Sequence, residues 1–282
     1  MENCAGGGHQ YAASLSVAKL TNKTEAVKLL ASKNPQVQAI ALRGLDCASP
    51  SGVIPLGRTA WAMVKPLLTS DSLEVRSCAA RVAGNASGDE VPATERALAI
   101  IGGMSGIESL PNAGRRLGYD LFNSARVACP ESDVTYSTFT YALSSKLLGV
   151  SLDVLRASTP HEPGIVRDCL LVARACRGDG TAKAEMRRLV REHPSPLVRK
   201  QALAAFENWG TTEDLSILEE VVRQDPAVQK KWMPHILRSE EDEIPRDYYP
   251  LREMAKLVIN AIQKRESAPS GTNSPAGKPG QK

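Results

Sequence analysis

Apolar residues recur along this chain at the spacing of one helix face. In and just after the stretch DSLEVRSCAARVAG, which starts at position 71, five small or apolar residues fall at offsets 0, 3, 4, 7 and 11: Val75, Cys78, Ala79, Val82 and Ala86. This spacing places their side chains on one side of a helix. The pattern predicts an amphipathic helix, with Cys78 as a core residue rather than a reactive thiol.

The same template recurs in four other segments, whose first apolar positions are Val37, Val166, Val198 and Leu251. Three sites pair a capping side chain with a proline: Asn34-Pro35, Ser195-Pro196 and Asp225-Pro226. A cap accepts a free backbone N–H, and proline supplies a helical φ angle where no donor is needed. Each site is therefore expected to begin a helix.

Amphipathic second helices are predicted between these segments, over residues 181–192 and 212–224. The repeating unit is therefore a helix–turn–helix with a period of roughly 30 to 45 residues. One such pair cannot bury its apolar face alone, so neighbouring pairs are expected to stack into a superhelix.

The strings DSLEVRSCAARVAG, HPSPLVRKQALAAFENWG, DPAVQKKW and PLREMAKLVINAI resemble HEAT repeats of the short bacterial type. The resemblance covers residues 34–48, 71–86, 163–177, 194–238 and 249–265, and it is poor at 104–160. It implies an all-α, right-handed α-solenoid of about six helix pairs with a degenerate middle section. The Gly102-Gly103 pair and Gly106 are expected in a turn.

The residue after the first apolar position is arginine in four copies: Arg76, Arg167, Arg199 and Arg252. In HEAT repeats this arginine joins a ladder of hydrogen bonds within and between repeats, so the resemblance implies a structural role for these four residues. Gln38 and Gln229 stand at the same position in the remaining copies and make the ladder incomplete.

The ends of the chain differ in composition from the repeats. Residues 1–10 are expected to form a flexible leader, residues 11–266 the repeat array, and the Pro-, Gly- and Ser-rich residues 267–282 a disordered tail. The acidic segment 239–247 is expected to be a loop before the last helix.

Composition narrows the class of protein. Aromatic residues make up 4% of the 282 residues, so the core must consist of Ala, Leu, Val and Ile, which suits close helix packing. The net charge of +4 is too small for a dedicated nucleic-acid binder. No apolar run reaches the roughly 18 residues of a transmembrane helix.

The spacing of the cysteines indicates the cellular location of the protein. The six cysteines form no CxxC motif, which favours reduced thiols and a cytoplasmic protein. An alternative comes from Cys4 and the glycines after it, which look like the mature start of a bacterial lipoprotein. In that case Cys4 would carry a lipid anchor and the sequence would lack an upstream signal peptide.

Sequence motifs for catalysis or metal binding are weak. His9, His161, His193 and His235 are expected to be solvated or capping residues, and the single His161-Glu162 pair is not a metal site. Trp209, Trp232 and Asp214 could serve a HEAT-like alkylpurine DNA glycosylase, but Trp209 fits the apolar stripe. We therefore expect no enzymatic activity, no cofactor and no metal.

One basic helix stands out as a candidate binding surface. Its cations Lys183, Arg187, Arg188 and Arg191 lie opposite the apolar residues of the same helix, and we place them on the concave side of the array. Arginine suits carboxylate or phosphate recognition. The sequence thus predicts a non-catalytic scaffold for a protein partner, and the arginines would suit a partner with an acidic segment. Nucleic-acid binding, a lipid-anchored envelope assembly protein and a merely solvated helix face are the alternatives.

Overall fold

The computed structural model describes residues 23–47, 54–87, 90–110, 131–227, 229–231 and 246–267. Its α-helices are α2 (Lys23–Leu29), α3 (Pro35–Cys47), α4 (Arg58–Val64), α5 (Leu73–Asn85), α6 (Ala93–Met104), α7 (Glu131–Ser144), α8 (Leu152–Ala157), α9 (Ile165–Cys176), α10 (Gly180–Glu192), α11 (Pro196–Trp209), α12 (Leu215–Gln224) and α13 (Pro250–Ser267). The prediction of an all-α chain is confirmed for this mostly helical part.

Short elements complete the fold. The 3₁₀ helices are η1 (Lys65–Thr69), η2 (Ile107–Ser109) and η4 (Thr212–Asp214). The strands form one parallel pair, β1 (Ile54–Pro55) with β2 (Ala86–Ser87), and one antiparallel pair, β3 (Gln229–Lys231) with β4 (Arg246–Tyr248).

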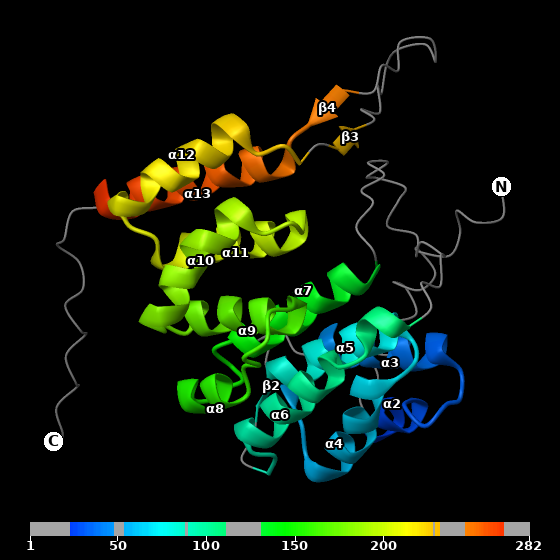
Figure 1. Ribbon diagram of the computed structural model, residues 1–282. Coiled ribbons are helices and arrows are strands. Elements are labelled where there is room, and N and C mark those ends of the chain that lie inside the picture. The colour runs from blue at the N-terminus through cyan, green and yellow to red at the C-terminus, as the bar shows by residue number, and fades with distance from the viewer. Residues whose placement is uncertain are drawn as a thin grey trace, which may run out of the picture.

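The helices pack in the order of the chain (Figure 1). One row consists of successive contacts between α3, α5, α7, α9, α11 and α13. We call this the odd row. Helices α2, α6, α10 and α12 pack beside it, each against an odd-row neighbour. The odd row contains all five template segments, so the repeated apolar stripe is what brings successive helices together.

Capping residues set several helix starts. Asn34 Oδ1 accepts from Gln36 N at 2.9 Å, and Ser72 accepts from Val75 N at the start of α5. Helix α11 begins at Pro196 as predicted, but Ser195 makes no side-chain capping bond. Proline at the first helical position is sufficient there, because its φ angle is already helical.

Two hydrophobic cores meet inside α9. Cys169, Leu170 and Ala173 belong to a core that extends back to α2, whereas Leu171 and Val172 belong to a second core that extends to α13. Because residues one position apart on a helix point about 100° apart, one helix can serve both cores. Ala, Leu, Val and Ile make up most of the core, as the composition predicts, but its largest fully buried side chains are the aromatic residues Tyr136, Phe139 and Phe206.

The predicted helix at Asp225-Pro226 is wrong. Residues 225–227 are irregular, and the next described element is strand β3, which pairs with β4 immediately before α13. Arg252 of α13 donates to the Asp225 carbonyl oxygen at 2.8 Å. Helix α13 therefore contacts the turn that follows α12.

The Gly102-Gly103 pair was also predicted wrongly as a turn. Both residues lie inside α6, and only Gly106, with a φ of 70°, lies in a turn. A Cβ atom on Gly103 would lie 2.6 Å from the Leu68 carbonyl oxygen. Glycine at this position thus permits close approach of two backbone segments within a helix.

Several predictions fall outside the described residues. These are the leader 1–10 with Cys4 and His9, the tail beyond Ser267, the side chain of Gln229, and Trp232 and His235. In the predicted degenerate section 104–160, residues 111–130 also lie outside, while α7 and α8 are described.

Candidate functional site

In each template segment, the first apolar residue is followed by an arginine or a glutamine. In three of these segments this side chain donates hydrogen bonds to the turn that precedes its own helix. Gln38 Nε2 donates to the carbonyl oxygens of Leu30 and Ser32, at 3.3 and 2.7 Å. Arg199 Nη1 donates in the same way to the carbonyl oxygens of His193 and Pro194. Glutamine and arginine thus satisfy equivalent carbonyl groups that no helix bond reaches.

Arg76 makes the most extensive set of these bonds. It is buried and donates to the carbonyl oxygens of Thr69 and Ser70 in the preceding turn and of Gly103 and Ser105 at the end of α6. Burial lowers its pKa because the surroundings disfavour the charge. Four of the five N–H donors of the guanidinium group are therefore bound to carbonyl oxygens, and the side chain links α5 to the end of α6.

The arginines at the same position in the other template segments, Arg167, Arg199 and Arg252, have different partners. Arg199 forms a buried bidentate pair with Asp225, with Nε–Oδ2 at 3.0 Å and Nη2–Oδ1 at 3.2 Å. Arg252 lies 4.0 Å from the ring centroid of Tyr249 in addition to its bond to the Asp225 carbonyl. Arg167 is partly exposed and forms longer ion pairs with Asp168 and Glu185.

Two buried carboxylates form further links that the sequence analysis missed. Asp179 is the N-cap of α10 and accepts from Arg156 and Arg174, both at 2.9 Å. Asp214, 1% exposed, forms a capping box with Thr211 and accepts from Arg187 at 2.6 Å. The Thr-x-x-Asp spacing at 211–214 is a capping-box-like signal that could have identified the second link.

Hydrogen bonds dominate the charge state of Asp179. Burial raises the pKa of its carboxyl group, but hydrogen bonds from Arg156, Arg174 and the Ala182 amide outweigh burial and lower the pKa to about 2. The carboxylate is therefore charged at neutral pH and firmly held between α8, α9 and α10.

The predicted binding cations Lys183 and Arg187 lie against Trp209. Their cationic groups are 5.1 and 5.5 Å from the indole ring centroid, and the ring also packs on Phe206 at 4.3 Å between centroids. Since Arg187 is also bound to the buried Asp214, its contacts hold α10 to the turn before α12. A cation in this arrangement stabilises the helix packing.

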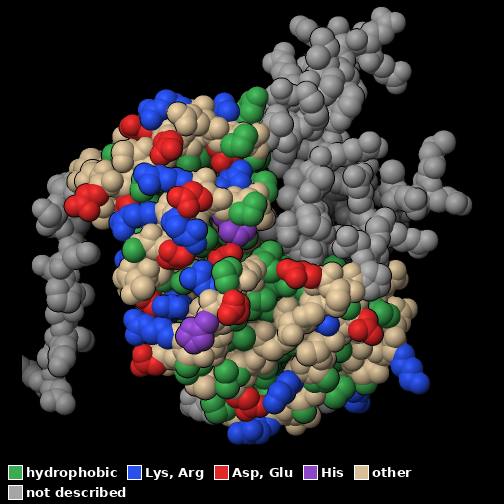
Figure 2. Space-filling view, viewed as in Figure 1, with side chains coloured by type: hydrophobic (Ala, Val, Ile, Leu, Met, Phe, Trp, Pro, Cys, Tyr) green, Lys and Arg blue, Asp and Glu red, His purple; other side chains and the backbone are tan. Residues whose placement is uncertain are grey.

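The other two predicted cations are more exposed and also paired. Arg188 contacts Glu185 at 2.7 Å and Glu192 at 3.6 Å, and Arg191 contacts Glu220 at 3.2 Å. Figure 2 shows this mixture as Lys and Arg side chains interspersed with Asp and Glu over the C-terminal helices. Three arginines facing four carboxylates do not create a strongly positive surface, which argues against nucleic-acid binding.

His193 was predicted to be a solvated or capping residue, and it is the C-cap residue of α10. Its Nε2 lies 2.9 Å from Asp168 Oδ2 on α9, and its Nδ1 accepts from the Ser195 backbone N–H at 3.1 Å. The imidazole therefore connects α9 with the turn before α11. His161 and Glu162 are exposed in the turn before α9.

Cys78 is 8% exposed and lies in the N-terminal core. Burial raises the pKa of its thiol to about 11, although Arg43 and Arg81 lie near enough to oppose this shift. The expectation of an inert core cysteine agrees with this environment.

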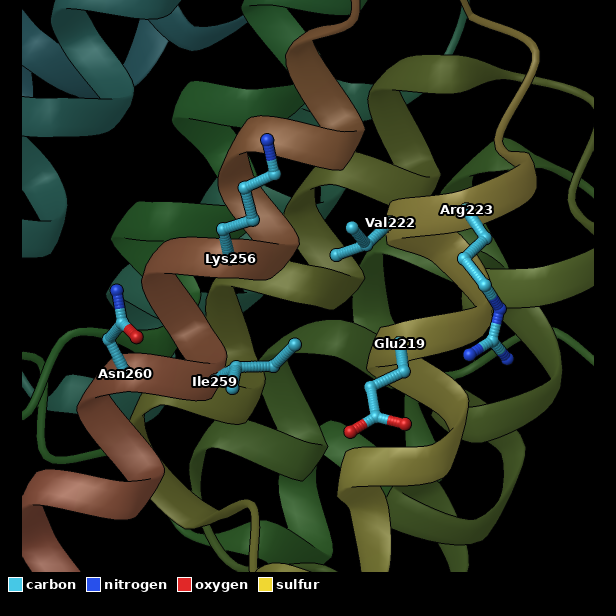
Figure 3. Close-up of a pocket in the computed structure, with 6 residues that line it drawn as sticks. All are labelled: Glu219, Val222, Arg223, Lys256, Ile259 and Asn260. Atoms are coloured by element: carbon cyan, nitrogen blue, oxygen red, sulfur yellow. The ribbon is translucent and has the colours of Figure 1, made fainter.

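A shallow groove separates α12 from α13 at the C-terminal end of the described helices. Figure 3 shows Val222 and Ile259 pointing toward one another from the two helices. Charged or polar residues surround this apolar floor: Glu219, Arg223, Lys256 and Asn260. A polar outer surface of this kind is typical of the terminal pair of a helical array.

Within the described ranges, no three His, Cys, Asp or Glu side chains cluster in a way that could hold a metal ion. The helices of the same ranges also include none with the length and apolar character needed to cross a membrane. No family model, curated protein or solved structure matches the chain.

Proposed function

We propose that this protein is a non-catalytic scaffold of HEAT-like repeats, arranged as a right-handed α-solenoid, that binds a protein partner. The observation that carries the proposal is the packing of successive template helices into the odd row, which supplies one extended surface from α3 to α13. Arrays of this type bind partners through many contacts spread along such a surface.

The spacing of the helices indicates which layer of the array lies on the concave side. Consecutive odd-row helices contact each other extensively, whereas α10 and α12 touch at few residues. In a curved two-layer array the more closely spaced layer lies on the inside of the curve, so we assign the concave side to the odd row. Helix α10 belongs to the other layer, and this assignment moves its four cations from the concave to the convex side.

The partner therefore meets residues of the odd row in this proposal. Lys200 on α11 and Leu257 on α13 are both exposed, and Leu257 is the most exposed large hydrophobic residue of the described chain, at 65%. An exposed leucine and an exposed lysine on neighbouring odd-row helices suit a partner segment that carries apolar and acidic side chains. Binding through Lys183, Arg187, Arg188 and Arg191 stays a competing prediction.

Affinity capture of the full chain followed by mass spectrometry tests the proposal. The odd-row variant combines Lys200→Glu with Leu257→Asp, and the α10 variant combines Arg188→Glu with Arg191→Glu. Arg187 is left unchanged because a carboxylate there would face buried Asp214. A double variant of the exposed Lys28 and Lys33 to Glu controls for the change in charge.

We expect the odd-row variant to lose its stoichiometric partners and the other two variants to keep them. Loss of the partners in the α10 variant alone would show that the basic helix α10 is the binding surface. Retention of every partner in all variants would contradict both surfaces. Cytoplasmic location belongs to the same proposal and is supported only by the pattern of cysteines.

A further inference from the structure

The division of the hydrophobic core at α9 separates the described helices into two units. The first unit contains α2 to α8, and the second contains α10 to α13, with α9 contributing different side chains to each. Figure 1 shows α9 in the middle of the molecule between these two groups. Because apolar burial supplies most of the stability of a packed unit, each group has its own source of stability.

Asp179 lies where these units meet. Arg156 on α8 and Arg174 on α9 both donate to Asp179 Oδ2 at 2.9 Å, while Asp179 Oδ1 accepts from the backbone amides of Thr181 and Ala182 on α10. Leu155, next to Arg156, is buried in the first core, and Ala182 is buried in the second. One buried carboxylate therefore connects the first unit to the first helix of the second.

We propose that the two units are separate cooperative units, and that Asp179 with its two arginines couples their unfolding. When this connection weakens, the second unit opens before the first. The order follows from the cores, since the second has fewer buried apolar side chains than the first. Such a joint would let the array change its curvature at α9 while each unit stays intact.

The substitution Asp179→Asn in the full chain tests the coupling. Asparagine keeps the capping function at this position, so the main loss is the charge that holds the two guanidinium groups. Asp153→Asn is the matched control because Asp153 pairs with the same Arg156 at 3.2 Å but is 89% exposed. Arg156→Ala is a second test variant that leaves both Arg174 and the cap in place.

Pulsed hydrogen exchange across a urea series, with mass spectrometry, follows the two units in one sample. Peptides from α5 report the first unit, and peptides from α11 report the second. In Asp179→Asn we expect the gap between the two unfolding midpoints to widen by about 1 M urea, with α11 at the lower midpoint. Asp153→Asn should leave the gap unchanged, and Arg156→Ala should widen it by a smaller amount.

A single midpoint shared by α5 and α11 in every variant would overturn the proposal, since it would show one cooperative unit. An unchanged gap would overturn it as well, because Asp179 would then couple nothing. If Asp179→Asn does not fold, Arg156→Ala is compared with Asp153→Asn instead. A gap between the α5 and α11 midpoints that is no wider in Arg156→Ala than in Asp153→Asn would then overturn the proposal.

Discussion

Several arginines in this protein satisfy backbone carbonyl groups. Arg76 donates to four carbonyl oxygens, and Arg265 likewise donates to the carbonyls of Glu207 and Gly210 at the end of α11. The last carbonyls of a helix lack partners within that helix. A long side chain with five donors can reach several of them from the next helix, which lysine cannot do as well.

Arg76→Ala should lower the free energy of unfolding by about 3 kcal/mol, because it leaves four carbonyl groups with no donor in a buried region. Arg76→Gln should recover part of this loss, since Gln38 binds the equivalent turn at its own position. Arg81→Ala on the same helix removes only an exposed ion pair with Asp46 and should cost less than about 1 kcal/mol. Urea denaturation measures all three, and an equal cost for Arg76→Ala and Arg81→Ala would contradict the structural role.

The thiol of Cys78 should react slowly in the folded protein. With a pKa of about 11, only about one molecule in a thousand carries the thiolate at pH 8, and the side chain is also buried. Alkylation with iodoacetamide at pH 8, read by peptide mass spectrometry, should modify Cys78 only after urea is added. Rapid modification without urea would show that the core around it opens readily.

At the scale of elements, the apolar period identified the odd-row helices well. The stripes beginning at Val37, Val75, Val166, Val198 and Leu251 lie in helices of that row, except that Ala86, the last residue of the Val75 stripe, lies in strand β2. The same reasoning failed at Asp225-Pro226, because a capping pair indicates only a local preference, and residues 225–227 are irregular and followed by strand β3. It also failed for Gly102-Gly103, where close packing against another segment outweighs the weak helix propensity of glycine.

The two adjacent glycines of α6 provide a matched pair of substitutions. Gly103→Ala places a methyl group 2.6 Å from the Leu68 carbonyl oxygen and should destabilise the protein by about 1 to 3 kcal/mol. Gly102→Ala meets no atom within 4 Å and should stabilise it by up to about 1 kcal/mol through helix propensity. Thermal unfolding compares the two variants, and effects of the same sign would refute the packing at Gly103.

The helix start at Asp179 should make stability depend on pH in acid. A carboxyl group whose pKa falls from 3.8 unfolded to about 2 folded stabilises the protein above about pH 4, and this contribution disappears as pH falls toward 2. The stability difference between wild type and Asp179→Asn should therefore shrink by about 2 kcal/mol from pH 5 to pH 2. Urea unfolding across that range measures it, and a constant difference would mean that the charge of Asp179 contributes nothing.

At the scale of the whole molecule, the sequence predicted the helical class but not the links between helices. A buried ion pair such as Arg187 with Asp214 joins residues far apart in the chain, and each looks like an ordinary surface residue in its own helix. The basic helix therefore resembled a binding surface in the sequence, whereas the structure pairs its charges with carboxylates from α10, α12 and the turn between α11 and α12. Such pairing depends on the stacking of repeats, which a period alone does not fix.

The central claim is that the odd row forms the surface that a partner contacts. Chemical cross-linking of the captured complex, followed by mass spectrometry, tests it most directly because each cross-link names a residue on this chain. A predominance of cross-links to Lys200, Lys256 and Lys264 on α11 and α13 is the predicted result. Cross-links confined to Lys183 on α10, or none to a second protein at stoichiometric yield, would contradict the claim.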